Sequence, residues 1–120
     1  MNIDTQALVT LSAAGAGTYT SPDLQNAEWR GISVGINLTA MTSATVTVTV
    51  NGKDAASGTY YPLLSSTALA SAGFTALQVY PGLTNTANSR ADAVLPKTYQ
   101  ISVVVTGTSA TGTVGGSLIQ

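Results

Sequence analysis

The chain has 120 residues, the length of one ordinary domain, and contains neither His nor Cys. The absence of both residue types excludes disulfides, thiolate and imidazole metal ligands, Cys nucleophiles and any catalytic triad that needs His. Lys and Arg number four and Asp and Glu five, so charged residues make up 8% of the chain, too little positive charge for a row of phosphates.

The first six residues, Met1, Asn2, Ile3, Asp4, Thr5 and Gln6, show no core pattern. Residues 1–15 lack the Lys or Arg and the long apolar run of a signal peptide, so we interpret the start of the chain as mature sequence. We expect these six residues to precede the first strand and to form an arm that orders on contact with a partner.

Strict alternation of apolar and polar residues is the dominant signal in the rest of the chain. It is clearest over 32–38, 45–50 and 99–105, where apolar residues, most of them β-branched, occupy every second position. Such alternation is typical of strands with one buried face. We predict nine strands, at about 7–12, 17–20, 30–40, 44–51, 59–65, 74–80, 90–94, 98–106 and 111–119.

Turn residues separate these segments. Asn51-Gly52 predicts the start of a tight turn, with residues 55–58 continuing the loop, and residues 106–109 predict the link between the last two strands. The adjacent glycines Gly115 and Gly116 indicate a bulge or a close backbone contact.

Eight or nine short strands in one domain length predict an all-β fold. We expect residues 1–120 to form a single antiparallel β-sandwich or jelly-roll-like domain. The closing strand, around 114–119, is expected to pair near the N-terminal strand, which would bring both termini to one end. Long apolar runs are missing, so the sequence predicts no membrane partner.

The sequence offers few groups for chemistry. The carboxylates are spread along predicted loops and strand ends, and nothing in their spacing predicts that any two converge: Asp4, Asp23, Glu28, Asp54 and Asp92. We therefore predict a non-enzymatic protein with no catalytic residues, no cofactor and no metal. A calcium loop with Asn51 and Asp54 is the alternative to a plain hairpin there, but Lys53 lies between the two oxygen ligands, which favours the hairpin.

Aromatic residues give one further alternative. Five of them could stack on sugar faces in a carbohydrate groove, although packing in the core or at a sheet edge is the favoured interpretation: Trp29, Tyr60, Tyr61, Tyr80 and Tyr99. Arg30, and Arg90 near Asp92, are interpreted as members of solvated ion pairs.

Four stretches of the chain resemble small virion proteins of tailed phages, a group common in actinobacterial phages and prophages. The stretches are 29–34, 46–66, 77–84 and 94–99, and the resemblance extends over roughly residues 20–119. It implies a capsid decoration (cement) protein that binds the outside of the head, with the major capsid protein as partner.

The low charge and the strand edges that few charges guard predict a homotrimer, in which neighbouring subunits would cover those edges. The lack of a signal peptide predicts assembly in the host cytoplasm, and the resemblance implies a final location on the capsid exterior. The arm of Met1–Gln6 would then be a capsid or subunit contact, and nucleic acid is not an expected partner. Two alternatives stay open: a glycan-binding module displayed on a surface, and a structural component of the tail or neck.

Overall fold

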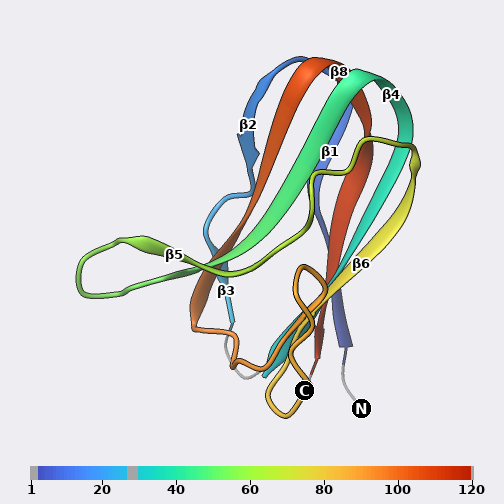
Figure 1. The fold of residues 1–120 in the computed structure, drawn as a ribbon. Helices are drawn as coiled ribbons and strands as arrows, with labels where there is room; N and C mark the ends of the chain where they lie inside the picture. Colours follow the sequence, from blue (N-terminus) through green and yellow to red (C-terminus); the bar gives the residue numbers. More distant parts are fainter. Residues whose placement is uncertain (1–2, 27–29, 120) are drawn as a thin grey trace.

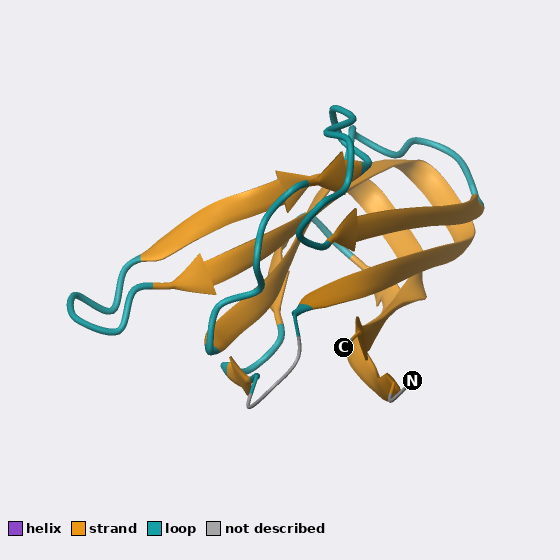
Figure 2. Cartoon of the chain, turned by 90° about the horizontal axis from the view of Figure 1, so that it is seen from below, coloured by secondary structure: helices purple, strands orange, loops and turns teal. Residues whose placement is uncertain are grey.

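The computed structural model describes the backbone of residues 3–26 and 30–119 and the side chains of residues 8–26 and 30–119. Every regular element in these ranges is a strand, which confirms the all-β prediction (Figure 2). The eight strands are β1 (Ile3–Ala14), β2 (Gly17–Thr20), β3 (Leu24–Gln25), β4 (Gly31–Lys53), β5 (Tyr60–Ser65), β6 (Gly73–Val79), β7 (Arg90–Ala91) and β8 (Thr98–Ile119).

All eight strands belong to one sheet built around the two longest strands, β4 and β8. These two pair antiparallel along their whole length, from Gly31 opposite Ile119 to Gly52 opposite Tyr99. The other edge of β8 pairs with β1, β2 and β3, and the other edge of β4 pairs with β6 and β5. A short parallel pairing joins β6 to β7. Figure 1 shows that β4 and β8 arch over together, so the sheet folds back on itself.

The fold-over divides the sheet into two layers. We define the first layer as β1, β6, residues 31–42 of β4 and residues 109–119 of β8. The second layer contains β2, β3, β5, residues 44–53 of β4 and residues 98–107 of β8. Apart from the short parallel pairing of β7 with β6 at the edge of the first layer, each layer is antiparallel. The two layers are joined through the bends of β4 and β8, which is the sandwich-like arrangement that the sequence predicted.

Three neighbouring strands bend at the same place, which we call the corner. Ala13 at the end of β1, Ser43 in β4 and Gly107 in β8 have positive φ angles of 46°, 44° and 99°. The pairings on either side, Ala14 with Ala110 and Ala44 with Gly107, bring these residues side by side. A positive φ bends a strand sharply. β1 ends at the corner, whereas β4 and β8 turn together and stay paired beyond it.

This corner changes two of the sequence-based boundaries. Residues 30–40 and 44–51, predicted as separate strands, form one strand, and so do 98–106 and 111–119. The predicted link at 106–109 is the bend of β8 rather than a loop. The fold therefore has two very long strands in place of four short ones.

The core lies between the two layers and is formed by the alternating apolar residues. In β4 the even-numbered positions 32–38 and 44–50 are buried, and in β8 the odd positions 99–105 and the even positions 110–118. The largest completely buried side chains are Tyr99, Ile32, Ile36, Leu77, Ile101 and Leu118. At about 25 cal/mol per Å² of apolar surface, this burial is the main favourable contribution to folding.

Hairpin β4–β5 projects from the body of the molecule (Figure 1). Its turn lies later than the sequence predicted, because Asn51 and Gly52 continue β4 and pair with Pro62 and Tyr61. The chain turns at residues 54–59 instead, where Gly58 N donates to the Asp54 carbonyl at 2.7 Å.

The N-terminal residues also differ from the prediction. Ile3–Gln6 do not precede the first strand but form its beginning, paired with Ile119–Gly116 of β8. Met1 and Asn2 lie outside the described residues. The pairing of β1 with the end of β8 does place Ile3 beside Ile119, as the sequence predicted for the two ends of the chain.

Candidate functional site

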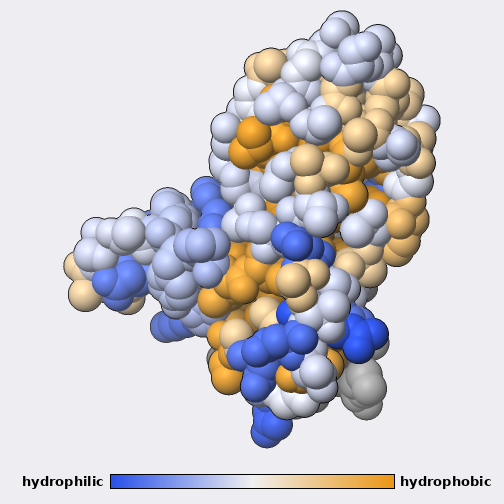
Figure 3. All heavy atoms as spheres, in the orientation of Figure 1, coloured by the Kyte–Doolittle hydropathy of each residue, from blue (hydrophilic) through white to orange (hydrophobic). Residues whose placement is uncertain are grey.

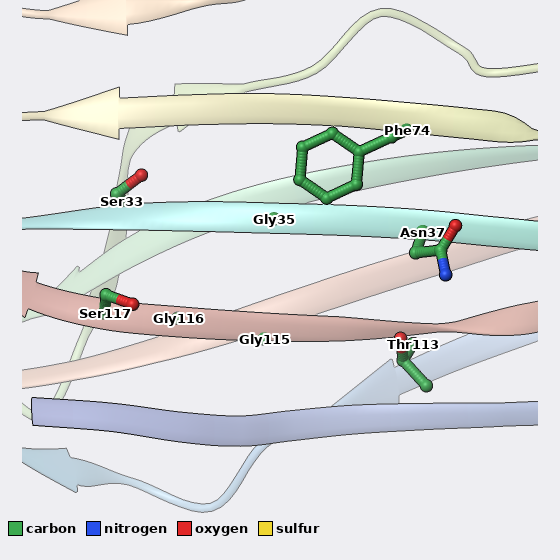
Figure 4. Close-up of a pocket in the computed structure, with 8 residues that line it drawn as sticks. All are labelled: Ser33, Gly35, Asn37, Phe74, Thr113, Gly115, Gly116 and Ser117. Carbon is green, nitrogen blue, oxygen red and sulfur yellow. The ribbon is translucent and has the colours of Figure 1, made fainter.

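The outer face of the first layer contains a shallow depression with a volume of about 330 Å³. It lies where β4 and β8 pair, and its centre is the directly paired Gly35 and Gly115. Because neither residue has a side chain, the sheet surface is hollow between the polar pairs on either side. Figure 4 shows the residues that line it, which are Ser33, Gly35, Asn37, Phe74, Thr113, Gly115, Gly116 and Ser117.

Phe74 of β6 is the one large apolar side chain in this depression and is 70% exposed. Its ring leans from β6 toward β4 and is seen nearly face-on in a view onto the sheet (Figure 4). A Cβ atom on Gly35 would lie 3.0 Å from Phe74 Cζ and 3.2 Å from Cε2. The glycine at position 35 therefore lets the ring rest against the strand.

Four short polar side chains border the paired glycines. The Ser33–Ser117 pair lies at one end and the Asn37–Thr113 pair at the other (Figure 4). Among the described residues, no hydrogen bond engages any of these four side chains. No charged residue lines the depression, so the site is polar, aromatic and neutral.

Phe74 was not among the residues predicted from the sequence, although one signal for it was present. In the strand 73–79 the buried residues are Leu77 and Val79, so alternation places Phe74 on the solvent side. A phenylalanine on the polar face of a predicted strand is a candidate for contact with a ligand or partner.

A second cluster, of charged and aromatic groups, lies at the base of hairpin β4–β5. Lys53 Nζ lies 2.7 Å from Asp23 Oδ2, and the Tyr60 hydroxyl donates to Asp23 Oδ1. The hydrogen bond from Lys53, and then that from Tyr60, holds the pKa of Asp23 below its ordinary value. The same contact with Asp23 raises the pKa values of Lys53 and Tyr60. These groups are partly exposed, so the cluster positions the hairpin and contributes little to global stability.

The other carboxylates whose side chains the structure describes, those of Asp54 and Asp92, have structural partners. The Ser57 hydroxyl donates to Asp54 Oδ2 at 2.6 Å and lowers the pKa of Asp54, and Gly82 N donates to Asp92 Oδ1 at 2.8 Å. Asn51 is part of β4, so it does not share a loop with Asp54 as a calcium site would require. The described residues contain no cluster of three or more acidic side chains that could hold a metal ion.

Of the five aromatic residues considered for a carbohydrate groove, the four in the described ranges do not form one exposed surface. Tyr99 is completely buried in the core and Tyr80 is half-buried, whereas Tyr60 and Tyr61 are exposed on the projecting hairpin. Trp29 lies outside the described residues.

The expected ion pair between Arg90 and Asp92 is not formed. Within the described ranges, the ion pair found is that of Lys53 with Asp23. On the face seen in Figure 3, strongly hydrophilic atoms gather on the projecting hairpin and at the lower end of the molecule. No helix in the described ranges is of a length and hydropathy that would span a membrane.

The outer edge of β1 is the longest unpaired strand edge in the part of the chain that the structure describes. β1 pairs with β8 on one side, and no described strand pairs with its other side. Its twelve residues contain one charged residue, Asp4, and no Lys, Arg or Pro. This edge contains Ile3–Gln6, four of the six residues predicted to make a contact.

No protein-family model matches the chain, and no curated protein matches it. Among solved structures, it is similar to infectious bursal disease virus of the Gt strain, with 14% identity over 98% of this chain and a TM-score of 0.47. The structure of the Gx strain of the same virus gives 15% identity over 98% of the chain, also with a TM-score of 0.47. The chain spans about a third of the length of these viral chains, 33% and 32%. Similarity at this level assigns neither a family nor a role.

Proposed function

We propose that this chain is a non-enzymatic structural protein of a virion, and more specifically a decoration protein on the outside of a tailed-phage head. Its partner would be the major capsid protein, and its site of action the capsid exterior. The observation that carries the proposal is the long unpaired edge of β1. The resemblance of the sequence to small phage virion proteins supports the finer assignment.

An unpaired strand edge presents a row of backbone donors and acceptors to any extended segment that approaches it. Proteins that remain monomeric usually block such an edge with Lys, Pro, a bulge or a very short strand. Over twelve residues β1 has no Lys or Pro, and its register shifts after Ala7 and after Leu11 are the features that interrupt the edge. Coverage by a partner through strand addition is the simplest use of this edge.

The low charge of the chain favours the same kind of contact. With charged residues at 8%, attachment has to rely mainly on apolar burial and backbone hydrogen bonds. The partners found for Asp23, Asp54 and Asp92 support the non-enzymatic part of the proposal, because each of these carboxylates already accepts a structural hydrogen bond.

The experiment is to add charge to the β1 edge. Thr10 and Ser12 are exposed in β1, so the variant Thr10→Lys with Ser12→Lys should fold normally and block strand addition. The matched control, Thr18→Lys with Thr20→Lys, adds the same charge to exposed positions of β2, another edge strand. Binding to heads purified without the protein should fall about tenfold or more for the β1 variant and stay near normal for the control.

Equal binding by both variants would contradict attachment through β1. Absence of the protein from purified particles would contradict the virion assignment itself. A cryo-electron-microscopy map of the particle would show where the protein lies. Density for this fold on the tail or neck, and not on the head, would mean that the protein is a tail or neck component rather than a decoration protein.

A further inference from the structure

We propose that the depression around Phe74 is a binding subsite for a neutral sugar ring, which stacks on Phe74 and hydrogen-bonds to the polar side chains beside it. This inference does not depend on attachment to a capsid. It rests on the orientation of one exposed ring and on the chemistry of the residues around it.

The ring of Phe74 is arranged as a platform. One side rests against Gly35, and the ring is presented nearly parallel to the sheet surface (Figure 4). An exposure of 70% leaves most of this large apolar side chain in water, at a cost in free energy that a stacked ligand would recover. A sugar ring has an apolar C–H face of matching size, whose contact with an aromatic face needs no deep pocket.

The groups beside the platform match the edge of a sugar. Ser33, Thr113 and Ser117 offer hydroxyl groups, and Asn37 offers an amide, which together can both donate and accept hydrogen bonds. The described structure uses none of these four side chains for its own hydrogen bonding. Sugar hydroxyls also donate and accept hydrogen bonds, so they can pair with these four side chains.

Charge and size define the ligand further. No Asp, Glu, Lys or Arg lines the depression, which favours a neutral sugar over a phosphorylated or carboxylated one. Its volume of about 330 Å³ is at the lower limit for small-molecule sites, which suits one or two sugar rings.

A protein partner fits this site less well. The centre of a protein interface usually buries several large apolar or aromatic residues, within roughly 800 Å² on each side. Here Phe74 is the one large apolar residue, and the residues around it are Gly, Ser, Thr and Asn. The patch can stack one ring, but it lacks the apolar area for the core of a protein contact.

The test is an NMR titration of the full chain with three probes: the methyl β-glycosides of glucose, galactose and N-acetylglucosamine. We expect at least one to bind with a dissociation constant on the order of 1 mM, as small ligands of shallow sites do. The shifted resonances should map to Phe74, Gly35, Asn37 and Ser117.

Variants then distinguish loss of the ring contact from loss of folding. Phe74→Ala should weaken binding about tenfold or more, whereas Phe74→Tyr, which keeps the ring, should bind within about threefold of the native protein. Gly35→Ala should weaken binding at intact stability, because its Cβ pushes the ring off the strand. Tyr61→Ala, which removes another exposed ring outside the depression, is the control and should bind normally.

The proposal is overturned if none of the three glycosides shifts these resonances at about 50 mM, well above the expected constant. Binding that maps to Tyr60 and Tyr61, or binding that Phe74→Ala leaves unchanged, would also overturn it. If Phe74→Ala instead disrupts self-association or head binding while no glycoside binds, the site is a protein contact.

Discussion

At Gly107 the backbone has a φ of 99°, and the carbonyl oxygen of Ser43 would lie 2.0 Å from any Cβ placed there. Only glycine fits, because other residues avoid this φ and a backbone oxygen cannot move aside cheaply. The bend of β8 at the corner therefore depends on this one residue.

Gly107→Ala should lower the free energy of unfolding by about 3 kcal/mol or more, from backbone strain together with the clash. Gly82→Ala is the matched control, since Gly82 has a φ of 93° with no atom near the added Cβ. It should cost about 1–2 kcal/mol, from strain alone. Urea denaturation measures both, and equal losses would mean that the close approach at the corner is unimportant.

Asp23, Lys53 and Tyr60 predict how the hairpin responds to pH. The pKa of Asp23 is lower in the folded protein than its ordinary value of 3.8, so its contacts stabilise the hairpin above about pH 4 and are lost as the pH falls through the folded value. The pKa values of Lys53 and Tyr60 are raised above their ordinary values of 10.5 and 10.0. Their contribution to the stability of the hairpin is therefore complete below about pH 10 and is lost as the pH rises through the pKa values of the folded protein.

The protection factors of amides in β5, which correct for the pH dependence of intrinsic exchange, should therefore fall at both acid and alkaline pH, while those of core amides change little. In Asp23→Asn the acid transition should disappear, and exchange in β5 should already be faster at pH 7. If this variant keeps the acid transition unchanged, the transition is caused by another carboxyl group.

At the scale of the elements, alternation in the sequence was enough to find the strands but not to join them. Residues 39–43 are mostly polar and exposed, which is typical of a loop, and their membership of β4 depends on β8 bending beside them. The pairing register of β4 with β8 is set by residues far apart in the chain. The position of Phe74 beside Gly35 also depends on pairing between distant segments. The contact of Asp23 with Lys53 and Tyr60 also joins distant segments, so local patterns could not predict it.

Deletion of Met1–Gln6 tests the N-terminal part of β1. The deletion removes the pairing with residues 116–119 of β8, so it should weaken head binding and also lower the melting temperature. Deletion of Met1 and Asn2 alone keeps every described pairing of β1 and is the control. If the six-residue deletion leaves head binding unchanged, the contact lies on another part of the sandwich.

At the scale of the whole molecule, the net charge of −1 and the unpaired β1 edge both favour association. We predict a symmetric homo-oligomer, a trimer, in sedimentation experiments at tens of micromolar. Head binding should change less than about threefold between 0.05 and 1 M sodium chloride, because salt screens exposed charges but leaves apolar contacts intact or stronger. A fall of several orders of magnitude would indicate an electrostatic contact instead.

The central position of β8 in the sheet has a consequence for the order of events in folding. The last long strand of the chain is the one with which β1, β2, β3 and β4 all pair, so none of these pairings can form until it has been synthesised. Contacts between residues so far apart in sequence make folding slow, and refolding from urea should take milliseconds to seconds. A chain ending at Lys97 should remain unfolded by circular dichroism. Until β8 has been synthesised, the earlier strands lack their pairing partner. The chain is most prone to aggregate during this time.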